Sequence, residues 1–201
     1  MWIGPAVGDP SCCSPDEHER AARHRNPDSA RVWLSARALL RHHLAEATGT
    51  SPAAIVLDER PGGKPFARDI AVHVNLSHAR GLVAIAIGAP DVGPVGVDIE
   101  GDRRLHRPDR LAARLLGDEG ERDRWSATPE PDRTRFLLQR WTRTEALLKA
   151  TGEGIGGGVA GAEERLVAAG WAVRDLTVPG GGFGAVAARG TTWEVRTLAP
   201  T

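Results

Sequence analysis

Two acidic side chains alternate with apolar ones in the segment Gly96-Val97-Asp98-Ile99-Glu100. In an extended strand successive side chains point to opposite faces, so Asp98 and Glu100 share one face. Two neighbouring carboxylates repel each other unless a proton or a cation lies between them. Mg²⁺ binds a few carboxylates, keeps several waters and accepts phosphate oxygens. The spacing therefore indicates a magnesium site, although a solvated strand face with two acids has the same pattern.

A second group of reactive side chains lies on one face of a candidate helix. Trp141, Glu145 and Lys149 stand four residues apart, which places them on a common helical face. The carboxylate of Glu145 would complete a metal site with Asp98 and Glu100, and the ammonium of Lys149 would neutralise phosphate charge. An ordinary surface pair of glutamate and lysine has the same spacing, so both interpretations stay open.

Two shorter motifs supply groups that bind anions. Ser77 and His78 end a β-prone run, where a hydroxyl and an imidazole can bind phosphate. A nucleophile–base pair is disfavoured because catalytic partners converge in space and no G-x-S-x-G turn is present. A structural histidine remains the alternative. Lys64 and Pro65 follow two glycines in a turn, which predicts either an exposed lysine that meets an anion or a solvated hairpin tip.

The elements that position these groups are helices and strands in mixed order. Helices are predicted over 27–47 and 132–150 from apolar residues at helical spacing, the first capped by Asp28 or Ser29 and ended by Gly49. The segment 103–116 is basic and partly helical. β-prone composition predicts strands at 54–57, 72–76, 82–87, 95–99, 171–178, 183–188 and 192–198.

An internal echo predicts how these elements are grouped. The segments 71–87 and 171–188 both have the order strand, turn, strand, and each comes after a helix. This repetition is compatible with an α+β fold made of two duplicated halves, although a coarse similarity of this kind also arises by chance. A groove between two such halves is a preferred place for a ligand site. The formal G-x-G-x-x-G match at 152–157 follows a helix and not a strand, so a dinucleotide site is excluded.

Composition excludes other classes of protein. The 201 residues include 26 basic and 26 acidic ones, so the net charge is zero and a broad basic surface for nucleic acid is disfavoured. No apolar run approaches the ~18–20 residues of a membrane-spanning helix, and no signal peptide is visible. Cys12 and Cys13 are adjacent and rarely pair, and their spacing to His18 and His24 matches no usual zinc site. We expect a soluble, cytoplasmic protein with reduced cysteines.

Taken in their order along the chain, four motifs resemble those of the 4′-phosphopantetheinyl transferases of the long, two-half Sfp type. The motifs are Gly63-Lys64-Pro65, Asn75-Leu76-Ser77-His78, Gly96-Val97-Asp98-Ile99-Glu100 and Trp141-x-x-x-Glu145-x-x-x-Lys149. The resemblance covers the chain from about residue 14 to the last strand. It implies a pseudo-twofold α+β monomer, with coenzyme A bound at the interface between the halves 1–95 and 96–201.

The resemblance also implies a role for each matching residue. The implied ligands of Mg²⁺ are Asp98, Glu100 and Glu145. The implied catalytic residues are Glu145 and Lys149. The implied contacts with coenzyme A are Arg31, Lys64, Pro65, Ser77 and His78. Arg31 is assigned from the stretch Asp28-x-x-Arg31, Arg20 is a weaker candidate for the same 3′-phosphate, and Arg37 and Arg41 brace the helix.

The implied reaction moves 4′-phosphopantetheine from coenzyme A to a serine of an acyl or peptidyl carrier protein in polyketide or nonribosomal peptide biosynthesis. A metal ion and a lysine aimed at the pyrophosphate stabilise the developing charge, and Glu145 is the candidate base for the serine proton. Carrier proteins are typically acidic, so the basic residues between Arg103 and Arg114 are a candidate docking surface.

One position departs from the family pattern W-x-x-K-E, because Thr144 stands where the lysine is usual. Either Arg140 or Arg143 replaces the missing cation, or the grip on phosphate is weaker. Thr144 also leaves open a homologue that binds coenzyme A or a carrier protein without catalysis. A different Mg²⁺-dependent phosphoryl enzyme explains the acids but not the order of the other motifs.

Overall fold

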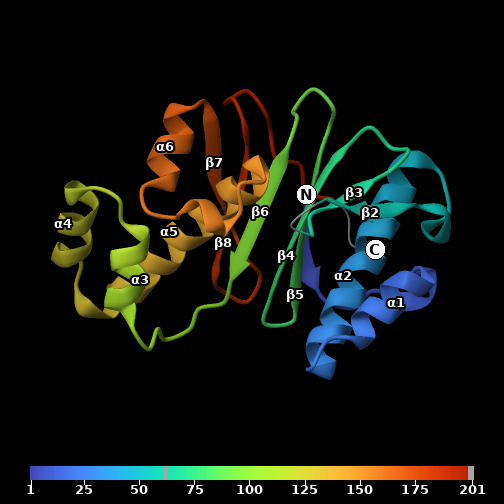
Figure 1. Ribbon diagram of the computed structural model, residues 1–201, viewed down its shortest axis with the longest axis horizontal. Coiled ribbons are helices and arrows are strands. Elements are labelled where there is room, and N and C mark those ends of the chain that lie inside the picture. Colours follow the sequence, from blue (N-terminus) through green and yellow to red (C-terminus); the bar gives the residue numbers. More distant parts are fainter. Residues whose placement is uncertain (61–62, 199–201) are drawn as a thin grey trace.

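A computed structural model describes residues 1–60 and 63–198, which form a mixed α+β fold (Figure 1). The helices are α1 (Pro15–Ala22), α2 (Pro27–Thr48), α3 (Pro108–Leu115), α4 (Glu119–Ala127), α5 (Glu130–Thr151) and α6 (Ala162–Ala168). The strands are β1 (Trp2–Pro5), β2 (Leu57–Glu59), β3 (Pro65–Ala67), β4 (His73–Ala79), β5 (Leu82–Gly88), β6 (Val95–Glu100), β7 (Trp171–Leu176) and β8 (Phe183–Arg189).

Two three-stranded antiparallel sheets share one topology. The first sheet has the order β1-β5-β4 and the second has the order β6-β8-β7. In each sheet the earliest strand of the chain pairs with the last strand of a hairpin, β4–β5 or β7–β8. Strands β2 and β3 form a separate two-stranded ribbon. The strand–turn–strand order predicted for 71–87 and 171–188 is confirmed, because both segments form antiparallel hairpins.

Helices cover the outer sides of the two sheets. Figure 1 shows α1 and α2 on one side, the strands in the middle, and α5 with α6 on the other side. Leu44 of α2 belongs to one apolar cluster with Ile85 of β5, and Leu147 of α5 belongs to another with Ala185 of β8. A third cluster joins β5 to β6 and β8 and includes Val97. The face of β6 that carries Val95, Val97 and Ile99 therefore points to the core between the sheets.

The close approach of β6 to α5 depends on a glycine. A Cβ atom at Gly96 would overlap the carbonyl oxygen of Ala146 and lie 2.5 Å from the amide nitrogen of Ala150. Any larger residue would push the strand away from the helix, and Asp98 would move with it. The glycine that opens the acidic motif thus sets the distance between the strand and the helix that carry the site.

The ends of the long helices follow from local sequence. Asn26 caps α2, and its side chain accepts the amide of Asp28 at 2.8 Å. The predicted cap at Asp28 or Ser29 is therefore wrong, because Pro27 is already preorganised for the first helical position. Gly49 ends α2 and Gly152 ends α5, with φ angles of 70° and 81° that glycine adopts without steric cost.

Two predicted strands are wrong. Residues 52–54 form a 3₁₀ turn, and β2 begins only at Leu57. The segment 192–198 has β-prone composition but no regular strand; it is tied to Met1, the residue before β1, by bonds from Leu198 N to Met1 O at 2.7 Å and from Met1 N to Arg196 O at 2.6 Å. Among the described helices, none is both long and apolar enough to cross a bilayer.

Candidate functional site

Strands β4 and β6 and helix α5 bring three of the sequence motifs around one open cavity of about 510 Å³. Six of the predicted site residues line this cavity: Ser77, His78, Asp98, Glu100, Glu145 and Lys149. They are separated by up to 72 positions in the sequence, from Ser77 to Lys149. We call this space the acidic cavity, because three carboxylates lie on its wall.

Side chains of β4 satisfy the backbone of β6, which is an edge strand of its sheet. Asn75 Oδ1 accepts the amide N–H of Val97 at 2.8 Å, and Ser77 Oγ accepts that of Ile99 at 3.2 Å. Both pairs of residues are two positions apart, as the period of a strand requires. The spacing of Asn75 and Ser77 is a signal for this contact, and the sequence reasoning assigned no role to Asn75.

Asp98 is held between a hydroxyl and an ammonium. Its side chain is buried, and its Oδ1 accepts a hydrogen bond from Ser77 Oγ at 2.8 Å and another from Lys149 Nζ at 2.7 Å. Lys149 Nζ also donates to the carbonyl oxygen of Val97 at 3.2 Å. Lys149 is thereby anchored to β6 at two points. Its cation lies beside the first acid of the predicted metal site.

Glu145 is a buried acid of the cavity whose charge is poorly compensated. It is 8% exposed, and its Oε1 is buried with no hydrogen-bond partner among the described residues. Burial raises the pKa of this carboxyl; Lys149 opposes the shift, while Asp98 and Glu100 add to it. The carboxylates of Asp98 and Glu100 are thus close enough to repel the charge of Glu145. A proton or a cation at Glu145 would relieve this repulsion.

The chemistry of the three acids suits a divalent cation, although the acids are not preassembled. Within residues 1–60 and 63–198 no three acidic, histidine or cysteine side chains are grouped closely enough to hold a metal ion. Asp98 is paired with the ammonium of Lys149 and not with a second carboxylate. The unpartnered oxygen of Glu145 and its repulsion by two further carboxylates nevertheless match the hard oxygen donors that Mg²⁺ prefers. The donor set fits this ion.

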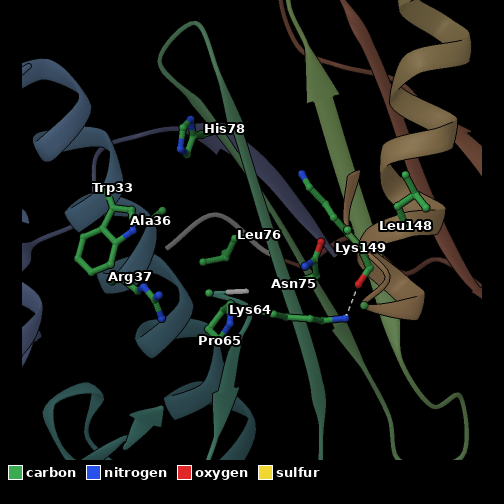
Figure 2. Close-up of a pocket in the computed structure, with 13 residues that line it drawn as sticks. Trp33, Ala36, Arg37, Lys64, Pro65, Asn75, Leu76, His78, Leu148 and Lys149 are labelled. Atoms are coloured by element: carbon green, nitrogen blue, oxygen red, sulfur yellow. Dashed lines mark hydrogen bonds between the residues drawn. The ribbon is translucent and has the colours of Figure 1, made fainter. Parts of the chain in front are cut away.

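A second cavity of about 310 Å³ adjoins the first, and His78 and Lys149 line both. Figure 2 shows its walls: Trp33 and Arg37 on α2, Lys64 and Pro65 at the start of β3, and Leu148 and Lys149 on α5. Burial lowers the pKa of His78, and the nearby ammonium of Lys149 lowers it further. We call this space the helix cavity, because both long helices, α2 and α5, contribute side chains to its lining.

The structure places the predicted residue Arg31 away from both cavities. Its side chain is exposed and pairs with Asp28 at 3.1 Å. Arg37, which the sequence reasoning treated as a brace, is buried, pairs with Glu59 and lies 4.8 Å from the ring centre of Trp33. Arg37 lines the helix cavity and Arg31 does not line either cavity. The role of Arg31 in binding coenzyme A stays a prediction.

Lys64 lines the helix cavity, but its ammonium is directed to the backbone. Nζ donates to the carbonyl oxygen of Val95 at 2.9 Å and to that of Lys149 at 2.7 Å (Figure 2). Burial lowers the pKa of Lys64 to about 8, and the charge of Arg60 lowers it further. The expectation of an exposed lysine is therefore wrong. Its contact with coenzyme A stays a prediction.

Neither arginine near Thr144 replaces the missing lysine of the family pattern in this structure. Arg143 pairs with Glu163 at 2.7 Å, and Arg140 pairs with Glu163 at 2.5 Å and also with Glu121. Both arginines line a different cavity, which borders α4, α5 and α6. Thr144 itself is 1% exposed. These contacts therefore do not support the prediction that Arg140 or Arg143 replaces the missing cation at the site.

The fold and the site define a class: an α+β protein with one cavity lined by three acids and a second cavity lined by basic side chains, with His78 and Lys149 in the lining of both. Comparison with known proteins identifies the family. The family model of the 4′-phosphopantetheinyl transferase superfamily matches residues 94–170. The chain is 32% identical over 152 residues to 4′-phosphopantetheinyl transferase psf-1 of Bacillus pumilus, covering 75% of this chain and 63% of that protein.

Two further relatives come from cyanobacteria. Identity to 4′-phosphopantetheinyl transferase HetI of Nostoc sp. is 31% over 146 residues, covering 71% of this chain and 60% of HetI. Identity to the putative 4′-phosphopantetheinyl transferase slr0495 of Synechocystis sp. is 31% over 169 residues, covering 79% of this chain and 67% of slr0495. The matched part spans less than two thirds of the first two relatives. The chain belongs to the 4′-phosphopantetheinyl transferase superfamily, as its motifs predicted.

Proposed function

We propose that this chain transfers the 4′-phosphopantetheine group of coenzyme A to a serine of an apo acyl or peptidyl carrier protein. The products are the holo carrier protein and 3′,5′-ADP. The observation that carries the proposal is the acidic cavity, which Asp98, Glu100, Glu145, Lys149 and His78 line together in a member of this superfamily. Polyketide or nonribosomal peptide biosynthesis is the context that we propose for the carrier.

Coenzyme A is proposed to bind across the two adjoining cavities, with its pyrophosphate near Lys149. The two sheets of equal topology support a division into duplicated halves, 1–95 and 96–201, with the site at their interface. His78 and Lys149, one from each half, line both cavities. One chain thus supplies both walls, which supports a monomer. The free cysteines agree with a cytoplasmic, reducing location.

Mg²⁺ is the proposed cofactor, and Asp98, Glu100 and Glu145 are the side chains that would hold it. Their shared cavity and the unpartnered oxygen of Glu145 support this assignment. When bound, the ion would supply positive charge to the pyrophosphate oxygens. Lys149 supplies a second positive charge next to the same acids.

In the proposed reaction the serine oxygen forms a bond to the β-phosphorus of coenzyme A, and the bond from that phosphorus to the oxygen of 3′,5′-ADP breaks. Glu145 accepts the serine proton. Glu145 is the candidate base because its carboxylate lines the same cavity as Lys149 and has a buried oxygen without a hydrogen-bond partner among the described residues. Lys149 stabilises the negative charge that develops on the phosphoryl oxygens.

The surface proposed to bind the acidic carrier protein lies next to the acidic cavity. It consists of exposed arginines in and before α3: Arg103, Arg104, Arg107, Arg110 and Arg114. Arg103 lines the acidic cavity, which supports a place for the carrier serine nearby. Reversing the charge of Arg107 and Arg110 to glutamate should weaken carrier binding and leave coenzyme A binding unchanged. Unchanged carrier affinity would remove this surface from the proposal.

One observation favours a second candidate function. Thr144 is buried and uncharged where the family pattern has lysine, so a homologue that binds coenzyme A or a carrier protein without catalysis would retain the same cavities. The complete set of three acids with Lys149 favours the enzyme. The two candidates differ in whether a carrier protein gains mass.

Intact-mass spectrometry of a carrier protein tests the proposal. Several apo carrier proteins are incubated with this chain, coenzyme A and Mg²⁺, and one phosphopantetheine adduct per carrier is expected. The variant Glu145→Gln is the matched control, because it keeps the side-chain shape and removes the base; it should give no adduct. The absence of an adduct on every carrier would overturn the enzyme assignment, and full activity of Glu145→Gln would overturn the role of Glu145.

A further inference from the structure

The chain contains only two lysines, and the side chains of both donate hydrogen bonds to residues of β6. Of the 26 basic residues 24 are arginine, and only Lys64 and Lys149 are lysine. Lys64 Nζ donates to the carbonyl oxygens of Val95 and Lys149, and Lys149 Nζ donates to the carbonyl oxygen of Val97 and to Asp98. Figure 2 shows the bond from Lys64 to the backbone of Lys149. The two ammonium groups therefore lie along the same strand.

The carbonyl groups that Lys64 binds stand at the ends of two elements. The carbonyl of Lys149 lies in the last turn of α5, where the final four carbonyls have no intrahelical partner. Gly152 N satisfies the carbonyl of Leu148, one residue earlier. Val95 is the first residue of the edge strand β6. The negative end of the helix dipole also favours a cation at this place.

An ammonium suits this position better than a guanidinium. The ammonium is compact and directs three donors, so it can serve two carbonyls from different elements at once. Both hydrogen bonds of Lys64 go to neutral oxygens, and burial lowers the pKa of the group. These contacts use the side chain to join backbone segments, 85 and 31 residues away in the sequence.

We infer that Lys64 is a positioning residue that ties the end of α5 to the start of β6 and thereby holds Lys149 against Asp98. It acts through Lys149 and does not contact a phosphate of coenzyme A. The catalytic consequence of this inference rests on the proposed function. The tie itself does not, because it concerns only contacts within the chain.

Two variants of Lys64 separate the tie from a phosphate contact. Lys64→Met keeps the length of the side chain and removes every donor, whereas Lys64→Gln removes the charge and keeps a neutral N–H donor. Binding of coenzyme A is measured by calorimetry, turnover by intact mass of the carrier protein, and backbone protection by hydrogen–deuterium exchange of the peptides that cover 95–100 and 145–152.

If Lys64 is the tie, both peptides exchange about tenfold faster in Lys64→Met, because two partly buried carbonyls lose their donor. The exchange rate of the two peptides in Lys64→Gln lies between the rates in Lys64→Met and in the unmodified chain. The dissociation constant of coenzyme A stays within about twofold in both variants, while kcat falls about tenfold in Lys64→Met and less in Lys64→Gln. A loss of kcat without a loss of affinity distinguishes a positioning residue from a binding residue.

Two results would overturn the inference. Unchanged exchange in both variants would show that no tie exists. Equal weakening of coenzyme A binding in both, by about tenfold or more, would show that the charge of Lys64 binds phosphate. Should Lys64→Met fail to fold, the exchange and binding of Lys64→Gln still decide the question. A chain that modifies no carrier refutes the proposed function alone, because the exchange experiment requires no activity.

Discussion

Helices α2 and α5 are the same length and occupy similar places, but they bury different chemistry. Each has 22 residues, ends at a left-handed glycine and packs on a three-stranded antiparallel sheet. Helix α2 buries Arg37 and Arg41, and each of these cations is paired with a glutamate. Helix α5 buries Glu145, whose Oε1 has no partner among the described residues.

This difference separates charge that stabilises the fold from charge that is available for chemistry. A buried cation with a matched acid is satisfied within the chain and has little left to offer a ligand. A buried acid without a partner has a raised pKa and an energetic need for a proton or a cation, which is typical of functional sites. The buried arginines of α2 are therefore neutralised by glutamates, whereas the buried carboxylate of α5 has an oxygen without a partner among the described residues.

The largest expected effect comes from removing the ammonium of Lys149 on α5. Under the proposed function, Lys149→Met should lower the rate of carrier modification about 10³-fold, because the positive charge beside Asp98 is lost. The rate is measured by intact mass under saturating coenzyme A. The control Arg165→Met removes an exposed cation of α6 that pairs with Glu153, and it should retain full activity. Equal rates in the two variants would show that Lys149 contributes no more to turnover than an exposed cation of α6.

On α2 the expected effect is on stability and not on turnover. Arg41 is 3% exposed, binds Glu17 at 2.7 Å and also donates to the carbonyl of Pro52 at 3.2 Å. Arg41→Met leaves the buried Glu17 without its partner and should lower the free energy of unfolding by about 3 kcal/mol. Urea unfolding measures the change, and the double variant with Glu17→Gln should recover part of it. An additive loss in the double variant would show that the pair is not coupled.

Installing the lysine of the family pattern should destabilise the chain. Thr144 is 1% exposed, and the nearby Arg140 and Arg143 already pair with acids elsewhere. Thr144→Lys would bury a charge without an acid and should cost about 2 kcal/mol in unfolding experiments. Thr144→Val, of similar shape, is the control and should change stability by less than about 1 kcal/mol. A lysine that is tolerated here and raises turnover would show that position 144 can reach the site.

The smallest expected effect is the pH dependence that comes from His43 of α2. Its ring has no hydrogen-bond partner among the described residues and packs against Trp2, and burial lowers its pKa below 6.5. Between that lowered pKa and 6.5 the unfolded chain binds more protons, so stability decreases as the pH falls through this window. In His43→Leu this contribution disappears. The difference between the two chains is followed by urea unfolding from pH 7 to 5; parallel pH profiles would contradict it.

Local periodicity predicted the long elements well. The helices expected over 27–47 and 132–150 span 27–48 and 130–151; three of the four hairpin strands begin at the predicted residue, and the last residues of the four differ by one to three positions. Strand β1 and helices α1, α4 and α6 were not predicted, because they are short and their burial depends on distant partners. The predicted strand at 192–198 shows the converse: its composition is β-prone, but among the described residues its backbone bonds only to Met1 and forms no strand.

Residue types and their order along the chain determined the family and the six residues that line the acidic cavity, since alternate and four-residue spacings are local properties. Only the tertiary structure decided which charges remain free. Arg37 reached the helix cavity instead of Arg31, and Lys64 turned to the backbone of Lys149, 85 residues away. Whether a buried polar atom is satisfied depends on atoms that are distant in sequence, and no local pattern records them.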